Sequence, residues 1–226
     1  MYASVPTRYA STVTYRVPAP LFPHAAFDAV ILAGSLGSHS IIREVLGTLA
    51  ACDAPIIVLT HMSERYPSRL PEIVRTYTRA PVKKALDGDA LCAKTIYVAE
   101  PGRHVRVTSH GKLALDDGPR VRHVRPSADI LLSSAARAFG ARTLGVILSG
   151  NLNDGADGAA AVTAAGGVII AQEPRTAHAA GMPSAAIACG AARVVLPPSM
   201  LATAIDSLVR IPGFLAVLGL GRRSAA

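Results

Sequence analysis

The chain has 226 residues, of which 50% are hydrophobic and 17% are charged. A chain of this length and composition can bury a full hydrophobic core, which excludes an intrinsically disordered protein and predicts one large domain or two small ones. Its three cysteines are an odd number and lie far apart. This spacing excludes a disulfide scaffold and argues against a structural zinc site.

The formal net charge is +8, and six basic residues fall in one short stretch. Only six tyrosines, four phenylalanines and no tryptophan could stack on bases, so we expect no nucleic-acid binding. We interpret the basic stretch as a solvated face that could meet an acidic protein partner. Its residues are Arg103, Arg106, Lys112, Arg120, Arg122 and Arg125.

The sequence contains no candidate membrane span. Its longest apolar stretches, 143–148 and 214–220, fall well short of the ~20 residues that a spanning helix needs. Arginines and prolines interrupt the first 25 residues, which therefore do not resemble a signal peptide. We predict a cytoplasmic protein without membrane insertion.

The predicted elements begin after residues 1–26, which show no sustained pattern and are expected to form an irregular extension. The apolar run 29–33 predicts a strand that is buried on both faces. Apolar residues at helical spacing follow over 41–49, and a second buried run covers 56–59. Strand, helix and strand within about thirty residues predict a right-handed parallel βαβ unit.

The middle of the chain has shorter strand patterns at 95–99, 104–109 and 112–115, of which the last two predict an antiparallel hairpin. Ser127 is a predicted N-cap for a helix over 130–139. Further strands are expected at 144–148, 167–171 and 193–196, and further helices at 158–165 and 199–209. Because no repeat or low-complexity linker interrupts these elements, we predict one α/β domain over 27–212, followed by a tail at 213–226.

Three predicted strands are followed by polar side chains with reactive potential. Ser35 follows the first strand, His61 the second, and Asp154 lies in a Gly/Asn/Asp turn after the strand at 144–148. Each residue alone has an ordinary structural interpretation, as a turn serine, a backbone-bonded histidine or a helix cap. Ligands bind at the carboxyl ends of strands in an open parallel sheet, so the three together predict a nucleophilic triad. The chain order Ser, His, Asp differs from that of the α/β-hydrolases.

Other site chemistries are less consistent with the sequence. The seven histidines include no HxH or HExxH pair, so no metal site is expected. The turn at 33–38 lacks the GxGxxG pattern, and no acidic residue ends the following strand to hold a ribose. Hydrolysis without a cofactor is therefore preferred to dinucleotide binding.

Six segments resemble the catalytic domain of CheB-type protein-glutamate methylesterases, and the resemblance covers residues from about 28 to about 208. In chain order they are 33–37 (AGSLG), 60–62 (THM), 87–104 (with DGD and IYVAEPG), 125–131 (RPSADIL), 148–155 (LSGNLNDG) and 181–183 (GMP). The resemblance implies a doubly wound, mostly parallel sheet with helices on both faces and an antiparallel β-hairpin. The predicted domain over 27–212 would then be a methylesterase-like catalytic domain.

The same resemblance implies the chemistry of the site. Ser35 would be the nucleophile, His61 the base and Asp154 the orienting acid. The expected reaction is hydrolysis of glutamate methyl esters on chemoreceptor cytoplasmic helices or a similar methylated protein, with release of methanol and with deamidation of glutamines in some family members. The residues expected to hold the oxyanion or line the substrate site are Leu36, Asn151, Asn153 and Met182.

Several positions depart from the family pattern. The serine is preceded by Ala33-Gly34, where the order Gly-Ala is usual. Leu36 and Ser38 stand where a small polar residue and a glycine usually follow the serine, and Asn151 stands where methionine is typical. A second hypothesis is therefore a catalytically weakened interaction or regulatory module with the same fold. A third, suggested by the glycine-containing first loop and the basic charge, is a nucleotide-binding α/β protein.

Family members often carry a receiver domain, and none precedes residue 28 in this sequence. We expect the chain to be either unregulated in that way or controlled in trans by a receiver or another regulator.

Overall fold

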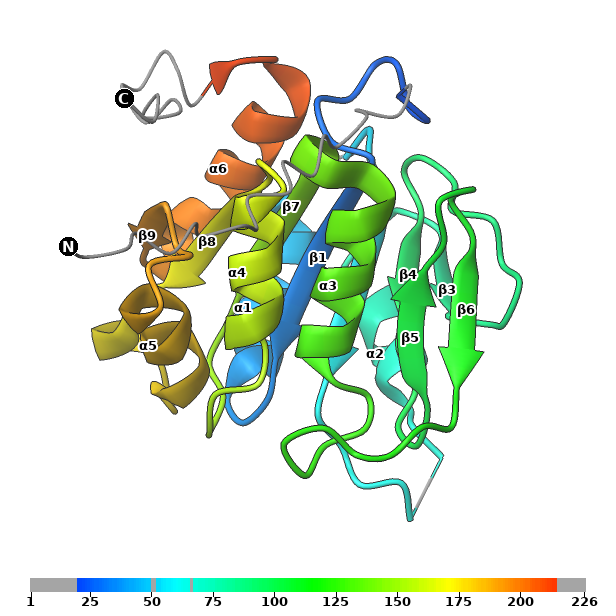
Figure 1. Ribbon diagram of the computed structural model, residues 1–226, viewed down its shortest axis with the longest axis vertical. Helices are drawn as coiled ribbons and strands as arrows, with labels where there is room; N and C mark the ends of the chain where they lie inside the picture. Colours follow the sequence, from blue (N-terminus) through cyan, green and yellow to red (C-terminus); the bar gives the residue numbers. More distant parts are fainter. Residues whose placement is uncertain (1–19, 50–51, 66, 215–226) are drawn as a thin grey trace, which may run out of the picture.

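Short runs of branched apolar residues form the central strands, because side chains buried on both faces of a sheet need no polar partner. Strands β1 (Ala29–Gly34) and β2 (Ile56–Thr60) are buried at every position. Seven parallel strands join in the order β3-β4-β2-β1-β7-β8-β9 (Figure 1). The structure is a computed structural model that describes residues 20–49, 52–65 and 67–214.

The remaining elements follow in chain order. The other strands of the main sheet are β3 (Val82–Lys84), β4 (Ile96–Val98), β7 (Thr143–Ile147), β8 (Val168–Gln172) and β9 (Val194–Leu196). The helices are α1 (Ser38–Thr48), α2 (Leu70–Arg75), α3 (Ala128–Phe139), α4 (Ala156–Ala164), α5 (Gly181–Ala188) and α6 (Pro198–Arg210), with 3-10 turns at Gly140–Arg142 and Pro174–Thr176. Strands β5 (His104–Val107) and β6 (Leu113–Asp116) form a separate antiparallel sheet.

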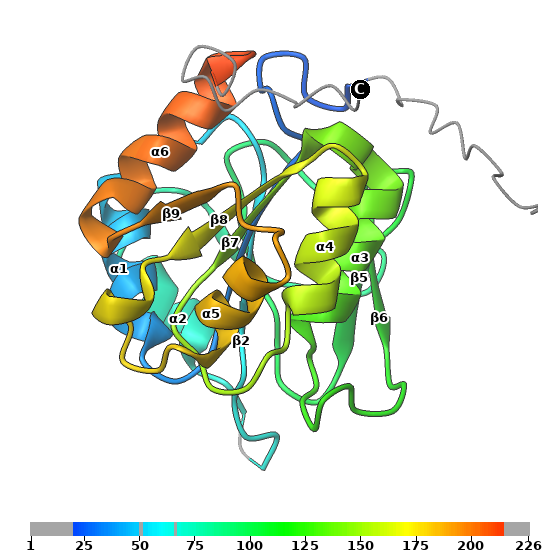
Figure 2. The same cartoon turned by 60° about the vertical axis from the view of Figure 1, so that its left-hand side comes forward.

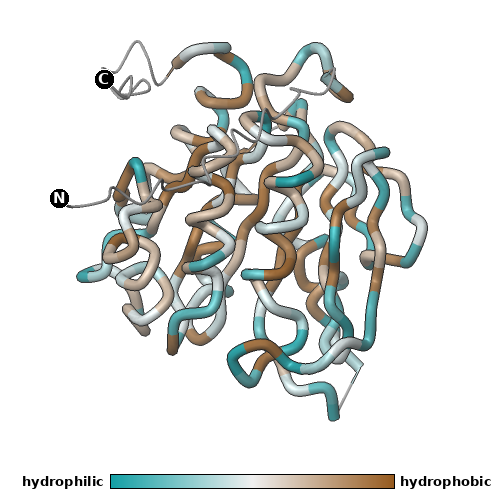
Figure 3. Tube along the Cα trace, viewed as in Figure 1, coloured by the Kyte–Doolittle hydropathy of each residue, from teal (hydrophilic) through white to brown (hydrophobic). Residues whose placement is uncertain are grey.

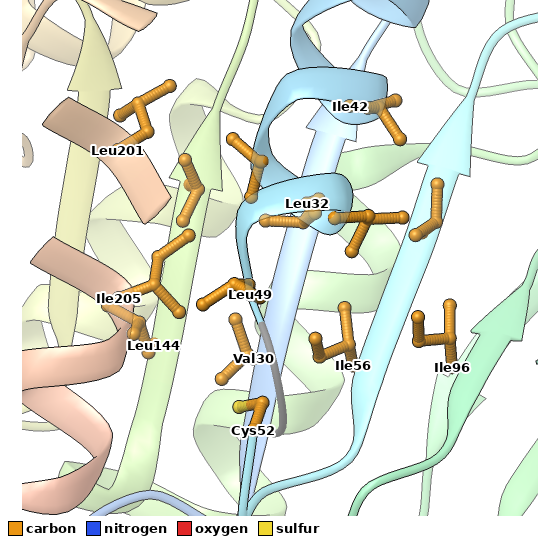
Figure 4. Close-up of a cluster of buried hydrophobic side chains, with 14 of the residues drawn as sticks. Val30, Leu32, Ile42, Leu49, Cys52, Ile56, Ile96, Leu144, Leu201 and Ile205 are labelled. Carbon is orange, nitrogen blue, oxygen red and sulfur yellow. The ribbon is translucent and has the colours of Figure 1, made fainter. Parts of the chain in front are cut away.

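Helices cover both faces of the main sheet, as Figure 2 shows. Helices α1, α2 and α6 pack on one face, where alternate residues of β1 such as Val30 and Leu32 point (Figure 4). Helices α3, α4 and α5 and the hairpin pack on the other face, against Ile31 and Ala33. Apolar residues line the strands and the inner sides of the helices (Figure 3). The predicted doubly wound fold is thereby confirmed.

The predicted hairpin forms, but it makes a sheet of its own. Its backbone is fixed to α3, because the Val107 amide donates to the Ser134 hydroxyl at 2.9 Å. The preceding strand pattern, 95–99, becomes β4 and pairs in parallel with β2 and β3 inside the main sheet. The hairpin therefore covers the flank of α3 instead of extending the sheet.

Part of the predicted extension is tied to the body of the fold. Arg142 donates to both carboxylate oxygens of the buried Asp28, at 2.8 and 2.9 Å, and to the carbonyl of Ala25 at 2.7 Å. Residues 1–19 and 215–226, and with them most of the predicted extension and tail, lie outside the described residues. The domain limits 27 and 212 stay predictions.

The order of the strands creates a switch point in the middle of the sheet. The chain starts at the central β1, builds outward to β3 and β4, and returns to form β7 on the other side of β1. The loops that leave the carboxyl ends of β1 and β7 therefore diverge to opposite faces, which leaves a crevice where ligands bind in such folds. Within the described part of the chain, no helix is long and apolar enough to cross a membrane.

Candidate active site

The structure brings the loops of Ser35, His61 and Asp154 to one edge of the sheet, at the bottom of the view in Figure 1. Gly34 of β1 pairs in register with Thr60 of β2, so Ser35 and His61 directly follow paired positions. The His61 amide donates to the Gly34 carbonyl at 3.2 Å. Since paired strands lie about 4.8 Å apart, the serine and histidine start as close neighbours.

Asp154 is almost completely buried and accepts hydrogen bonds from four groups. The ring nitrogen Nε2 of His61 lies 2.8 Å from Oδ2, and the Ser127 hydroxyl donates to Oδ1 at 2.7 Å. The backbone amides of Ala128 and Asp129 donate at 2.6 and 3.3 Å. These amides belong to the first turn of α3, where unpaired N–H groups and the helix dipole favour an anion.

These contacts decide the charge on Asp154. Burial by itself would raise the pKa of the Asp154 carboxyl, but hydrogen bonds from His61, Ser127 and Ala128 outweigh it and lower that pKa below its usual value. The neighbouring Asp129 behaves in the opposite way, because burial and the charge of Asp154 raise its pKa despite a hydrogen bond from Gly158. Asp154, with its lowered pKa, therefore faces the histidine as an ionised carboxylate.

The contact with Asp154 also sets the form of the His61 ring. A carboxylate can only accept, so we assign the proton to Nε2, which leaves Nδ1 as the ring's free acceptor. Within residues 20–49, 52–65 and 67–214, Nδ1 has no hydrogen-bond partner, and the Ser35 hydroxyl has none either. The structure thus joins His61 to Asp154 directly and leaves Ser35 beside them without a hydrogen bond to His61.

Two glycines let the loops come this close. Gly37 adopts φ of 81°, and a Cβ at this position would collide with His178 and lie 3.0 Å from the Ser149 hydroxyl. A Cβ on Gly150 would lie 2.8 Å from the Cβ of Ser35 and would collide with the sulfur of Met182. Gly150 therefore packs directly against Ser35 and leaves no room for a side chain between them.

The residues predicted to hold the oxyanion or to line the substrate site lie near Ser35 and Gly150. Leu36, Asn151 and Asn153 are exposed, whereas Met182 is fully buried and its amide donates to the Gly150 carbonyl at 2.9 Å. The amides of Leu36 and Asn151 have no acceptor among the described residues, so both are available to a ligand. Because Met182 is buried, it can affect the site only by holding Gly150 in position.

Three positioning residues were not predicted for the site. Ser127 was predicted only as the N-cap of α3, which it is, but its hydroxyl also holds Asp154. The Ser149 hydroxyl donates to the Leu36 carbonyl at 2.7 Å, which ties the β7 loop to the nucleophile turn. The Gln172 side chain accepts from the Ser149 amide at 2.9 Å. Both serines lie inside segments that carry the resemblance, which was the available signal.

Metal ligands do not gather at this edge. Across the residues that the structure describes, no three His, Cys, Asp or Glu side chains lie close enough together to hold a metal ion. The imidazole and carboxylate of the site bind each other, which is the arrangement of an acid–base pair.

Comparison with known proteins identifies relatives over most of the chain. A family model described as CheB methylesterase matches residues 30–205. Protein-glutamate methylesterase/protein-glutamine glutaminase 2 of Caulobacter vibrioides is 36% identical over 193 residues, which are 83% of this chain and 56% of the relative. Protein-glutamate methylesterase FrzG of Myxococcus xanthus is 37% identical over 190 residues, which are 84% of this chain and 57% of FrzG. The chain thus spans about half the length of these curated relatives.

A solved structure agrees with these matches. The crystal structure of the Thermotoga maritima CheB methylesterase catalytic domain has a TM-score of 0.78 and 29% sequence identity to this chain, and the match covers 81% of this chain and 99% of that domain. The resemblance inferred from the six segments is confirmed. The chain belongs to the CheB methylesterase family.

Proposed function

We propose that the chain is a protein-glutamate methylesterase of chemotaxis-type signalling, which hydrolyses glutamate methyl esters on the cytoplasmic helices of chemoreceptors. The names of its relatives, which include protein-glutamine glutaminase, support deamidation of glutamine at the same site. The observation that carries the proposal is the contact between His61 and the buried Asp154, one strand away from Ser35. The proposed substrate implies a cytoplasmic enzyme, and control by a receiver domain in trans stays a prediction.

The first half of the proposed reaction forms an acyl-enzyme. The Ser35 hydroxyl oxygen attacks the ester carbonyl carbon while Nδ1 of His61 takes the hydroxyl proton. Asp154 stabilises the imidazolium that forms, through its contact with Nε2. The tetrahedral intermediate then collapses, the bond to the methoxy group breaks, and His61 returns the proton so that methanol leaves.

The second half regenerates the serine. A water molecule gives a proton to Nδ1 of His61, and its oxygen attacks the acyl carbon. The bond to Ser35 breaks and His61 protonates the Ser35 oxygen. The glutamic acid that forms releases its proton to solvent and leaves a glutamate carboxylate on the substrate. With a glutamine substrate the same steps release ammonia in place of methanol.

The amides of Leu36 and Asn151 are the proposed oxyanion donors. Leu36 follows Ser35 in the chain, Asn151 follows Gly150, which lies against Ser35, and neither amide has an acceptor among the described residues. Loss of one such donor typically costs about 10²-fold to 10³-fold in rate. Asn153 is proposed to contact the substrate beside the two oxyanion donors. Met182 is proposed to hold Gly150 in position by packing against it. The departure at Leu36 does not remove a donor, since every residue except proline carries an amide N–H.

Methanol release and active-site labelling test the proposal together. The chain is expected to release methanol from a methylated receptor fragment, and a fluorophosphonate, which reacts with activated serines, is expected to label Ser35 and stop the release. Peptide mapping of the labelled chain locates the modified serine. No methanol and no label at Ser35 would favour the weakened regulatory module, which the missing hydrogen bond between Ser35 and His61 would then explain.

Ser127 is proposed as a positioning residue, and its replacement by alanine removes one donor from the buried carboxylate. A hydrogen bond to a charged group contributes about 1.5–3 kcal/mol, so kcat is expected to fall by about tenfold or more with little change in KM. Loss of this hydrogen bond together with the N-cap should also lower the free energy of unfolding by about 2–4 kcal/mol.

The Ser127→Thr variant keeps a hydroxyl and is expected to recover both kcat and thermal stability. Initial rates at several substrate concentrations separate kcat from KM, and thermal unfolding measures the stability. An alanine variant with wild-type kcat and only the stability loss would reduce Ser127 to a helix cap.

A further inference from the structure

A cavity of about 570 Å³ opens beside His61, between the loop that follows β2 and the segment that leads into α3. Its size is within the usual range of ligand pockets, about 300–1,000 Å³. The charged and titratable residues that line it are His61, Glu64, Arg65, Arg120, His123 and Arg125. The steps proposed above use only His61 from this set, so the rest of the cavity has no assigned role.

The cavity carries an excess of positive charge. The Glu64 carboxylate lies between two guanidinium groups, since it accepts a hydrogen bond from Arg120 and lies 3.6 Å from Arg125. Arg65 has no carboxylate partner among the described residues. Three guanidinium groups against one carboxylate leave a net charge of +2 before either histidine is counted.

This excess is local, because the rest of the predicted basic face is largely neutralised. Three of its arginines form ion pairs outside the cavity. The pairs are Arg103 with Asp117 at 3.0 Å, Arg106 with Asp116, and Arg122 with Asp129 at 2.9 Å. An acidic partner is therefore attracted to the cavity more than to the face as a whole.

The guanidinium groups of the cavity are also preorganised to bind a carboxylate. Arg125 is fixed by hydrogen bonds from Nη1 to the carbonyls of Asp117 and Gly118, at 2.9 and 3.0 Å. The Arg120 side chain is half-exposed, and its guanidinium donates to Glu64 and, from Nη1, to the His123 carbonyl at 3.4 Å. Guanidinium groups that are held in place lose little conformational entropy when they bind an anion. The contacts of Glu64 with Arg120 and Arg125 show that a carboxylate can bind between these two groups.

We propose that this cavity binds an aspartate or glutamate side chain of the substrate protein, about one helical turn from the esterified glutamate. The inference rests on the proposed function, because His61 is both the proposed base and part of the cavity wall. His61 lines the cavity and follows the β2 position that pairs with Gly34, the residue before Ser35. Residues three or four apart on a helix have Cβ atoms about 5–6 Å apart, so we expect a neighbour of an ester bound at Ser35 to reach the cavity past His61. Glu64 competes with that carboxylate for the arginines.

Paired peptides test this specificity. One helical peptide carries a glutamate methyl ester with a glutamate three or four residues away, and the other carries methionine in place of that glutamate. The full chain is expected to show a kcat/KM about fivefold higher for the acidic peptide at low salt, mainly through KM, and the preference should shrink in 1 M salt.

Two charge variants should move the preference in opposite directions. Arg120→Gln is expected to bring the ratio of the two kcat/KM values close to one, whereas Glu64→Gln frees both arginines and should raise the ratio. Arg137→Gln removes the same charge from an exposed site in the last turn of α3, at the end far from Ser127, and should leave the ratio unchanged. Equal rates for the two peptides, or a ratio that Arg120→Gln does not alter, would overturn the inference.

Failure of the proposed methylesterase activity can be distinguished from failure of the proposed carboxylate site. If neither peptide releases methanol, binding of the two fluorescently labelled peptides to the Ser35→Ala chain decides the question. Tighter binding of the acidic peptide would then support the carboxylate site in a chain that is not a methylesterase, and equal binding would overturn it.

Discussion

Methanol release from a methylated receptor fragment is expected to fall by about 10⁴-fold or more when Ser35 is replaced by alanine. Alanine keeps the backbone contacts of the turn, in which the Ser35 amide donates to the Ser149 carbonyl at 2.8 Å. It also keeps the Ser35 carbonyl as an acceptor for the Ser38 hydroxyl at 2.7 Å. Only the attacking oxygen is lost, so initial rates should collapse while thermal unfolding stays at the wild-type value.

Ser40→Ala is the matched control for this experiment. Ser40 lies in the same helix-start region but is exposed, and its hydroxyl only donates to the Gly37 carbonyl at 3.3 Å. This variant is expected to release methanol at the wild-type rate. If Ser35→Ala did the same, the nucleophile would have to be another group.

Replacement of Asp154 by asparagine is expected to lower kcat by about 10⁴-fold. The asparagine NH₂ group can donate to Nε2 of His61, which favours the tautomer with its proton on Nδ1. That tautomer cannot accept the Ser35 proton, although the ring stays in place. Asp157→Asn is the control, because Asp157 is an exposed carboxylate in the first turn of α4 and should be replaceable without loss of rate.

The same variant should change how stability depends on pH. The folded-state pKa of Asp154 lies below its ordinary value, so its ionised form stabilises the fold above the ordinary aspartate pKa. This contribution is lost as the pH falls through the lowered folded-state pKa. Unfolding midpoints between about pH 7 and pH 3 should therefore fall less steeply for Asp154→Asn than for the wild type. Parallel curves would show that Asp154 is not the stabilising anion.

The sequence predicted the buried strands and most of the helices, because their apolar periodicity is strong. It did not predict α2, β3 or α5. The six residues of α2 include Pro71 near the start. Strand β3 consists of three residues, two of them exposed lysines, and it pairs with β4. In α5, Gly181 and Pro183 read locally as turn residues, and only packing on the sheet makes the segment helical.

The site was predictable to the level of loops and residue types. Parallel strands end at one edge, so the sequence alone predicted that Ser35, His61 and Asp154 lie close together. The contacts that complete the site were not predictable, because they join distant parts of the chain. The Ser127 hydroxyl reaches Asp154 across 27 positions, and Arg120 reaches Glu64 across 56. No local pattern encodes such contacts.

Asp154 is bound to the first turn of α3, so fraying of that turn should also affect the orientation of His61. The amides of Ala128 and Asp129 are capped by the same carboxylate that orients His61. We therefore expect opening of that turn and release of the imidazole to occur together. Slow amide hydrogen exchange at these two positions would report, in the resting protein, the fraction of molecules whose histidine is correctly oriented.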